Sequence, residues 1–164
     1  MTSPIRRLLL LITIFGLIAP TLIECQSSVF AGDLSIPATD EGLPGAGPIR
    51  RYDWFQNLWT QRRTAWSKQV ERDQNAVVFL GDSITQGWGD SMGDSFQGMK
   101  VANRGISGDT TRGMLIRLKE DVFALNPSGL VMLMGTNDLE EGAAPETIAG
   151  NLKLIVEAAK KHNP

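Results

Sequence analysis

The sequence predicts an α/β fold in which a parallel sheet lies between layers of helices. Two continuous apolar runs, 76–80 and 130–134, and a weaker strand candidate at 100–103 alternate with segments of helical periodicity. Each strand candidate leads into a turn that contains glycine, at Gly81, at Gly105 and at Gly135. Strands that alternate with helices are typical of a parallel sheet covered on both faces. We therefore expect a three-layer α/β/α architecture.

The predicted helices rest on apolar side chains at helical spacing. One stripe lies between the second and third strands and consists of Met114, Leu118, Val122 and Leu125. Another consists of Ile148, Leu152, Ile155 and Ala159, and it follows Pro145, a residue that suits the first helical position. An earlier helix over about 49–68 has Tyr52, Phe55, Trp59 and Trp66 on one stripe, with Arg63 among them.

The N-terminus has the pattern of a signal peptide. Arg6 and Arg7 precede an apolar run at 8–23, and small side chains around Ala31 predict cleavage after that residue. The run is short for the ~20 residues of a membrane span. Export to the periplasm or the exterior is therefore expected. An uncleaved anchor and a lipidated Cys25, the only cysteine, are the alternatives.

The rest of the chain divides into a Gly/Pro-rich linker at 32–49, a covering helix at 50–74 and the sheet-containing domain at 75–164. The net charge of −2 gives no basic surplus, so no nucleic-acid partner is expected. A strand that is apolar at every position, as 130–134 is, belongs in the interior of a sheet. We therefore expect these 164 residues to contain only the first three strands of a larger sheet.

Three polar segments follow the three strands. They are Gly81-Asp82-Ser83, Asn103 to Thr111, and Gly135-Thr136-Asn137-Asp138. Each has an ordinary explanation: a serine helix cap, a tight turn with Asp109 capping the next helix, and an Asx turn. However, the carboxyl ends of parallel strands share one edge, where ligands bind. A nucleophilic hydroxyl, a glycine N–H and an Asn amide meeting there are the parts of an acyl-transfer site.

From about Val77 onward, these three segments resemble the SGNH (GDSL) hydrolases, and the Asn103–Thr111 segment resembles the platelet-activating-factor acetylhydrolase and thioesterase branches. The resemblance implies a flavodoxin-like sheet of order 2-1-3-4-5 and an esterase or lipase without metal or organic cofactor. It assigns the nucleophile and an oxyanion N–H to Ser83, and further oxyanion-hole donors to Gly108 and Asn137. Small acyl esters, lipids and acetylated carbohydrates are the expected substrates.

The sequence departs from this family at its last motif, Asp-x-x-His, which is absent. The only histidine, His162, is predicted in the last turn of a helix that starts at Pro145, about 25 Å from the active edge. We therefore expect the catalytic His and Asp to lie outside this chain. Two alternatives use the same fold, a non-catalytic binding module and an inactive fragment. Trp88 and Phe96 are candidates either for an acyl pocket or for core packing.

Overall fold

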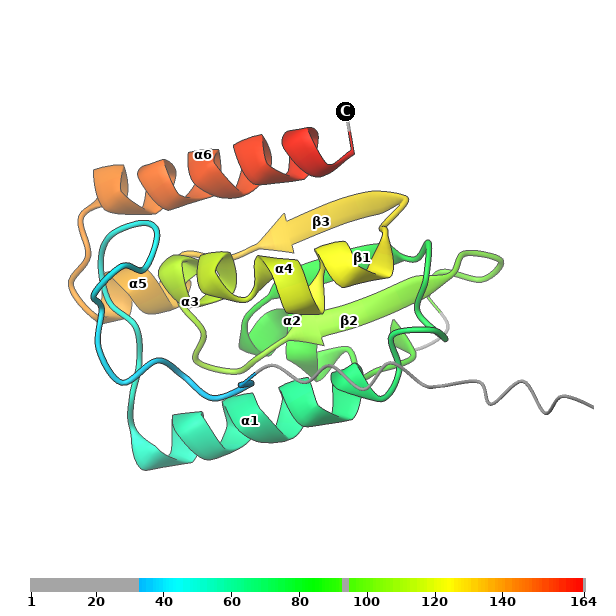
Figure 1. Cartoon of the computed structure of the whole chain (residues 1–164), viewed down its shortest axis with the longest axis horizontal. Helices are drawn as coiled ribbons and strands as arrows, with labels where there is room; N and C mark the ends of the chain where they lie inside the picture. Colours follow the sequence, from blue (N-terminus) through cyan, green and yellow to red (C-terminus); the bar gives the residue numbers. More distant parts are fainter. Residues whose placement is uncertain (1–32, 93–94, 164) are drawn as a thin grey trace, which may run out of the picture.

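The structure is a computed structural model that describes residues 33–92 and 95–163 (Figure 1). The predicted signal peptide, 1–31, lies outside the described residues. Strands β1 (Val77–Gly81), β2 (Val101–Gly105) and β3 (Gly129–Leu133) form one parallel sheet in the order β2-β1-β3. This confirms the predicted fold class and the first three positions of the predicted strand order.

The helices occupy the connections between the strands. They are α1 (Asp53–Ser67), α2 (Ser83–Gly87), α3 (Thr111–Ile116), α4 (Leu118–Asp121), η2 (Phe123–Leu125), α5 (Thr136–Glu140) and α6 (Pro145–His162). Helix α6 begins at Pro145 as predicted. The helix predicted between β2 and β3 is instead three short pieces. Arg117, at φ −103° and ψ 5°, separates α3 from α4, and Val122, at φ −118° and ψ −61°, separates α4 from η2. All four side chains of its predicted stripe are nevertheless buried.

The two faces of the sheet are covered unequally. Val78 and Leu80 point to the face on which α3, α4 and α6 pack, and they join the main apolar core. Phe79 points to the opposite face, where its ring packs on Phe96 with centroids 4.8 Å apart. On that face Val131 and Leu133 of β3 are 44% and 49% exposed. Within the described residues, β3 is therefore an edge strand with uncovered apolar side chains.

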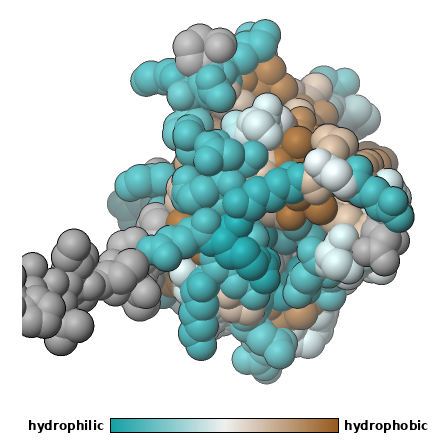
Figure 2. All heavy atoms as spheres, turned by 90° about the vertical axis from the view of Figure 1, so that its right-hand side faces the viewer, coloured by the Kyte–Doolittle hydropathy of each residue, from teal (hydrophilic) through white to brown (hydrophobic). Residues whose placement is uncertain are grey.

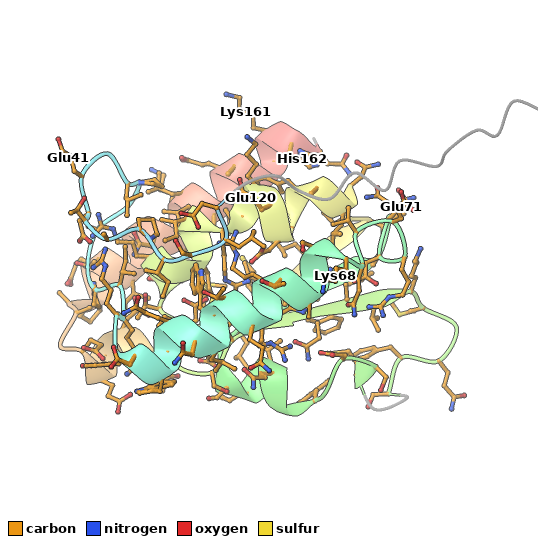
Figure 3. All side chains as sticks on the ribbon, turned by 60° about the horizontal axis from the view of Figure 1, so that its bottom comes forward. Glu41, Lys68, Glu71, Glu120, Lys161 and His162 are labelled. Atoms are coloured by element: carbon orange, nitrogen blue, oxygen red, sulfur yellow. The ribbon has the colours of Figure 1, made fainter. Side chains whose placement is uncertain are left out.

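Helix α1 lies across the domain near α4 (Figure 3). Phe55, Trp59 and Trp66 are buried as the stripe predicts, whereas Tyr52 is exposed. The predicted linker packs on this helix, since the Trp59 indole N–H donates a hydrogen bond to the carbonyl of Leu34 at 3.1 Å. The segment before α1 is thus an ordered arm in its described part.

Figure 2 shows the end of the molecule at which the strands begin. Its surface is mostly hydrophilic, with hydrophobic side chains exposed in part of it. Among the described residues, no helix has the length and apolar content needed to cross a membrane.

Candidate active site

Ser83 is the first residue of α2, and one residue, Asp82, separates it from the carboxyl end of β1. The N-cap of α2 is Asp82, whose buried carboxylate accepts a hydrogen bond from the Ile84 N–H at 3.0 Å. Ser83 itself is exposed. The explanation of Ser83 as a helix cap is therefore wrong, because Asp82 performs that role and the serine hydroxyl is left at the open edge of the sheet.

Two glycines allow α2 to pack directly on the strand ends. A Cβ at Gly81 would collide with Thr85 Oγ1 and lie 2.7 Å from the Leu133 carbonyl. A Cβ at Gly105 would collide with the backbone N of Gln86. Glycine is the residue that permits so close a backbone approach. These contacts fix the position of Ser83 relative to β2 and β3.

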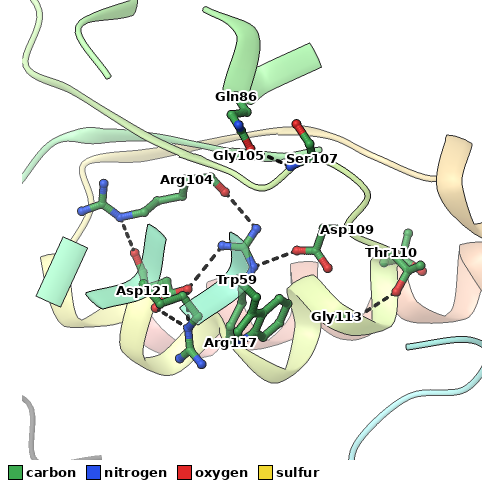
Figure 4. Close-up of polar contacts among 12 residues, drawn as sticks. Trp59, Gln86, Arg104, Gly105, Ser107, Asp109, Thr110, Gly113, Arg117 and Asp121 are labelled. Atoms are coloured by element: carbon green, nitrogen blue, oxygen red, sulfur yellow. Dashed lines mark hydrogen bonds and ion pairs between the residues drawn. The ribbon is translucent and has the colours of Figure 1, made fainter. Parts of the chain in front are cut away.

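Hydrogen bonds tie the first two polar segments together. The Ile106 N–H donates to the Gly81 carbonyl at 3.0 Å, and the Ser107 N–H donates to Gln86 Oε1 at 2.7 Å (Figure 4). The Asn103 amide donates to the carbonyls of Thr85 and Gly89, at 2.6 and 2.8 Å. Asn103 therefore has a structural role in holding the end of α2, which the sequence analysis did not assign.

The second and third polar segments also meet. Gly108 is buried and has a φ of +87°, a conformation that favours glycine. The structure records no acceptor among the described residues for its N–H. Asn137, on α5, is 9% exposed, and its Nδ2 donates a hydrogen bond to the Asp109 carbonyl at 2.8 Å. The two predicted oxyanion-hole donors thus lie on directly bonded segments.

Asp109 does not cap the following helix. The N-cap of α3 is Thr110, whose Oγ1 accepts a hydrogen bond from the Gly113 N–H at 3.2 Å (Figure 4). Asp109 is fully buried and accepts a hydrogen bond from Arg117 Nε at 2.9 Å. Burial raises the pKa of Asp109 to about 7, against the opposing effect of the Arg117 guanidinium.

Asp109 belongs to a buried Arg–Asp cluster that lies beneath the Gly108 loop. The cluster consists of Arg63, Arg104, Arg117, Asp73, Asp109 and Asp121. Arg104 binds Asp73 at 2.7 Å, while Asp121 binds Arg63 at 2.9 Å and Arg117 at 3.4 Å. The Arg104 and Arg117 guanidinium groups also stack on the Trp66 ring. The presence of Arg63 on the apolar stripe of α1 was the one sign of this cluster in the sequence.

Asp138, in the third polar segment, has a structural role. It is completely buried, and its carboxylate accepts hydrogen bonds from the N–H and the hydroxyl of Thr111, at 2.9 and 2.6 Å. Asn151 of α6 donates to the same hydroxyl at 2.9 Å. Asp138 therefore joins α5 to the start of α3 and leaves Asn137 as the residue of this segment that faces the Gly108 loop.

The only histidine lies away from this edge, as predicted. His162 is in the last turn of α6, and its ring stacks on Phe123 with centroids 4.7 Å apart. It lines a small surface pocket together with Ser128 and Gly129, at the amino end of β3. Among the described residues, no group of three or more His, Cys, Asp or Glu side chains is arranged to hold a metal ion.

An apolar cavity of about 260 Å³ is lined in part by α2, the helix that begins at Ser83. Its lining includes Ile84, Trp88, Met92 and Val131. Phe96 packs on Trp88 with ring centroids 5.8 Å apart. Trp88 thus lines a cavity that α2 borders, whereas Phe96 packs on Trp88 and Phe79.

The fold and the three segments at one sheet edge define the SGNH class of hydrolases, and comparisons with known proteins agree. Residues 79–164 match the model of the GDSL-like Lipase/Acylhydrolase family. The chain belongs to this family.

Sequence relatives and solved structures of hydrolases also match this chain. The chain is 30% identical over 109 residues to platelet-activating factor acetylhydrolase IB subunit alpha2 of Rattus norvegicus, covering 65% of this chain and 47% of the relative. It is 32% identical over 107 residues to esterase TesA of Pseudomonas aeruginosa, and this match covers 63% of this chain and 53% of the esterase. The crystal structure of a GDSL-like lipase from Bacteroides thetaiotaomicron superimposes on this chain with a TM-score of 0.52 and 33% sequence identity. The superposition covers 65% of this chain and 53% of the lipase. The chain spans about half the length of these proteins.

Proposed function

We propose that the protein is a serine ester hydrolase in which Ser83 forms an acyl-enzyme. The observation that carries the proposal is the placement of an exposed serine at the start of α2, at the edge where the Gly108 N–H and the Asn137 amide lie. Such an edge can supply both a nucleophile and the donors that stabilise a developing oxyanion.

The proposed reaction has two stages. The Ser83 hydroxyl oxygen attacks the acyl carbonyl, and the N–H groups of Ser83 and Gly108 together with Asn137 Nδ2 stabilise the resulting oxyanion. A general base takes the proton of the Ser83 hydroxyl and gives it to the departing alcohol oxygen, as the tetrahedral intermediate collapses and leaves the acyl group on Ser83. Water attacks this ester in the second stage and releases the carboxylic acid.

A serine hydroxyl needs a base to become an effective nucleophile at neutral pH. His162 cannot supply it, because it stacks on Phe123 at the amino end of the sheet. We propose that the His and Asp of an Asp-x-x-His motif come from residues beyond these 164. The coverage of only 47% and 53% of the two curated relatives supports this.

The proposed substrates are small acyl esters, lipids or acetylated carbohydrates, met after export through the N-terminal signal peptide. The name of one relative, an acetylhydrolase, favours a short acyl group. The apolar cavity that Ile84 and Trp88 line offers space for the acyl chain.

A fluorophosphonate probe tests the proposal, because it reacts with serines that are activated as nucleophiles. We expect the protein made from its complete coding sequence to be labelled on Ser83, as mapped by peptide mass spectrometry. The variant Ser91→Ala, at an exposed serine in the following loop, is expected to label like the wild type. A folded protein whose Ser83 stays unlabelled would contradict the proposal and favour the non-catalytic binding module.

A further inference from the structure

The segment that leads into α1 reaches the candidate active site through Arg50. In Figure 1 this segment passes beside α5 before it enters α1. Arg50 is only 8% exposed although it carries a charge. A buried guanidinium requires acceptors for its N–H groups, and the identity of those acceptors indicates what the residue does.

Three acceptors for Arg50 come from α5 and the residue that ends it. Nε donates to Glu141 at 2.6 Å, Nη2 donates to Glu140 at 2.5 Å, and Nη1 donates to Asn137 Oδ1 at 3.3 Å. Burial disfavours the guanidinium charge, but the hydrogen bonds to Glu140 and Glu141 outweigh this effect and raise the pKa of Arg50. The two glutamates therefore hold a fully charged Arg50 against Asn137.

Arg50 also lies against the other proposed oxyanion-hole donor. A Cβ built on Gly108 would come within 3.1 Å of Arg50 Nη1 and within 2.6 Å of the Trp54 ring. Arg50 thus bonds to Asn137, 87 residues further along the chain, and lies close to Gly108.

The contacts fix which way the Asn137 amide points. A guanidinium has donors and no acceptor, so only the oxygen of the amide can face Arg50. The amide nitrogen then faces the Asp109 carbonyl, to which it donates at 2.8 Å. With both ends of the amide held, the second proton on Nδ2 stays available for a ligand.

We propose that Arg50 is a positioning residue of the oxyanion hole, which orients the Asn137 amide through the Nη1–Oδ1 hydrogen bond. This inference rests on the proposed esterase function. The proposed role is geometric, since the charge of Arg50 is paired with the carboxylates of Glu140 and Glu141. A planar guanidinium can reach three acceptors at once, whereas a lysine ammonium lacks that fixed fork.

Arg50→Met in the protein made from its complete coding sequence is expected to lower kcat for a short acyl ester about tenfold and to leave KM within about twofold. Loss of a whole oxyanion donor costs ~10²–10³ in kcat, and loss of its orientation should cost less. The matched control is Arg51→Met, which removes a neighbouring ion pair with Asp40 and touches neither Asn137 nor Gly108. Both kinetic constants are expected to stay unchanged in this control.

A double-mutant cycle with Asn137→Ala separates positioning from general destabilisation. If Arg50 acts through Asn137, then Arg50→Met should change kcat by less than about twofold when Asn137 is already alanine. A further tenfold loss in that background, or an unchanged kcat in the single Arg50→Met variant, would overturn the inference. Arg50→Lys serves in the same cycle if the methionine variant does not fold.

Different results would overturn the proposed esterase function and the proposed role of Arg50. Wild-type protein without Ser83-dependent ester hydrolysis would overturn the proposed function, and the inference with it. Ser83-dependent hydrolysis that is indifferent to Arg50 would overturn the inference alone.

Discussion

Ser83→Ala is expected to lower kcat for p-nitrophenyl acetate by about 10⁴-fold or more, in the protein made from its complete coding sequence. The substitution removes the oxygen that forms the acyl-enzyme, and the donors that remain can supply only the residual catalysis of an oxyanion hole. Ser83 is exposed, and its neighbour Asp82 caps α2. The free energy of unfolding should therefore change by less than ~0.5 kcal/mol.

Steady-state hydrolysis and a urea titration of the same preparation measure both quantities. Ser91→Ala is the control, since it removes a hydroxyl from an exposed loop position close by in the chain. Its kcat and its midpoint of unfolding should match those of the wild type. Ester hydrolysis that persists in Ser83→Ala would show that the reaction takes place elsewhere.

The second large effect concerns stability. Arg117→Met is expected to lower the free energy of unfolding by about 3–5 kcal/mol, because it leaves the buried Asp109 carboxylate without its arginine and removes one of the two arginines that bind Asp121. Arg117 is completely buried and donates hydrogen bonds to Asp109, Asp121 and the Arg104 carbonyl. Methionine keeps much of the side-chain volume but none of these bonds. Urea unfolding followed by tryptophan fluorescence would report the change, since Trp59 and Trp66 lie against this side chain.

Arg51→Met supplies the comparison for that experiment. Its partner Asp40 is 49% exposed, and such surface ion pairs contribute about 0–1 kcal/mol. Equal effects of Arg51→Met and Arg117→Met would mean that the buried Arg–Asp cluster adds nothing special to stability. The cluster matters for the site as well, because the Asp109 carbonyl is the acceptor that holds Asn137 Nδ2.

The sequence was sufficient to predict the elements that repeat a local pattern. The apolar run at 76–80 became the central strand, and Pro145 marked the start of α6. The stripe on α1 correctly predicted that Trp59 is buried. Such predictions succeed because burial acts on side chains at regular spacing along a single element.

Contacts between distant segments could not be predicted in the same way. Nothing near Arg50 indicates that its acceptors would be residues of α5, because the pairing depends on how α1 packs against the domain. The break in the helix at Arg117 has the same origin, as this side chain is bound by Asp109 and by Asp121. The periodicity of apolar residues predicts which face of a helix is buried, but it does not predict which polar side chains will pair.

The sequence predicted that the three polar segments follow the strands and meet at one edge of the sheet, while the catalytic roles of their residues stay a prediction. The strand ends brought together the segments that carry Gly108 and Asn137, and α2 placed Ser83 at the same edge. The structural roles of Asn103 and Asp138 were missed, since an amide or carboxylate at a turn has the same appearance in a sequence whether it binds substrate or backbone.

Trapping the acyl-enzyme tests the role of Ser83 directly. The protein made from its complete coding sequence is mixed with p-nitrophenyl acetate, quenched with acid during turnover and analysed by peptide mass spectrometry. One acetyl group is expected on Ser83, and none is expected in the Ser83→Ala variant. Turnover without any acetylated peptide, or an acetyl group on another residue, would contradict the assignment of Ser83 as the nucleophile.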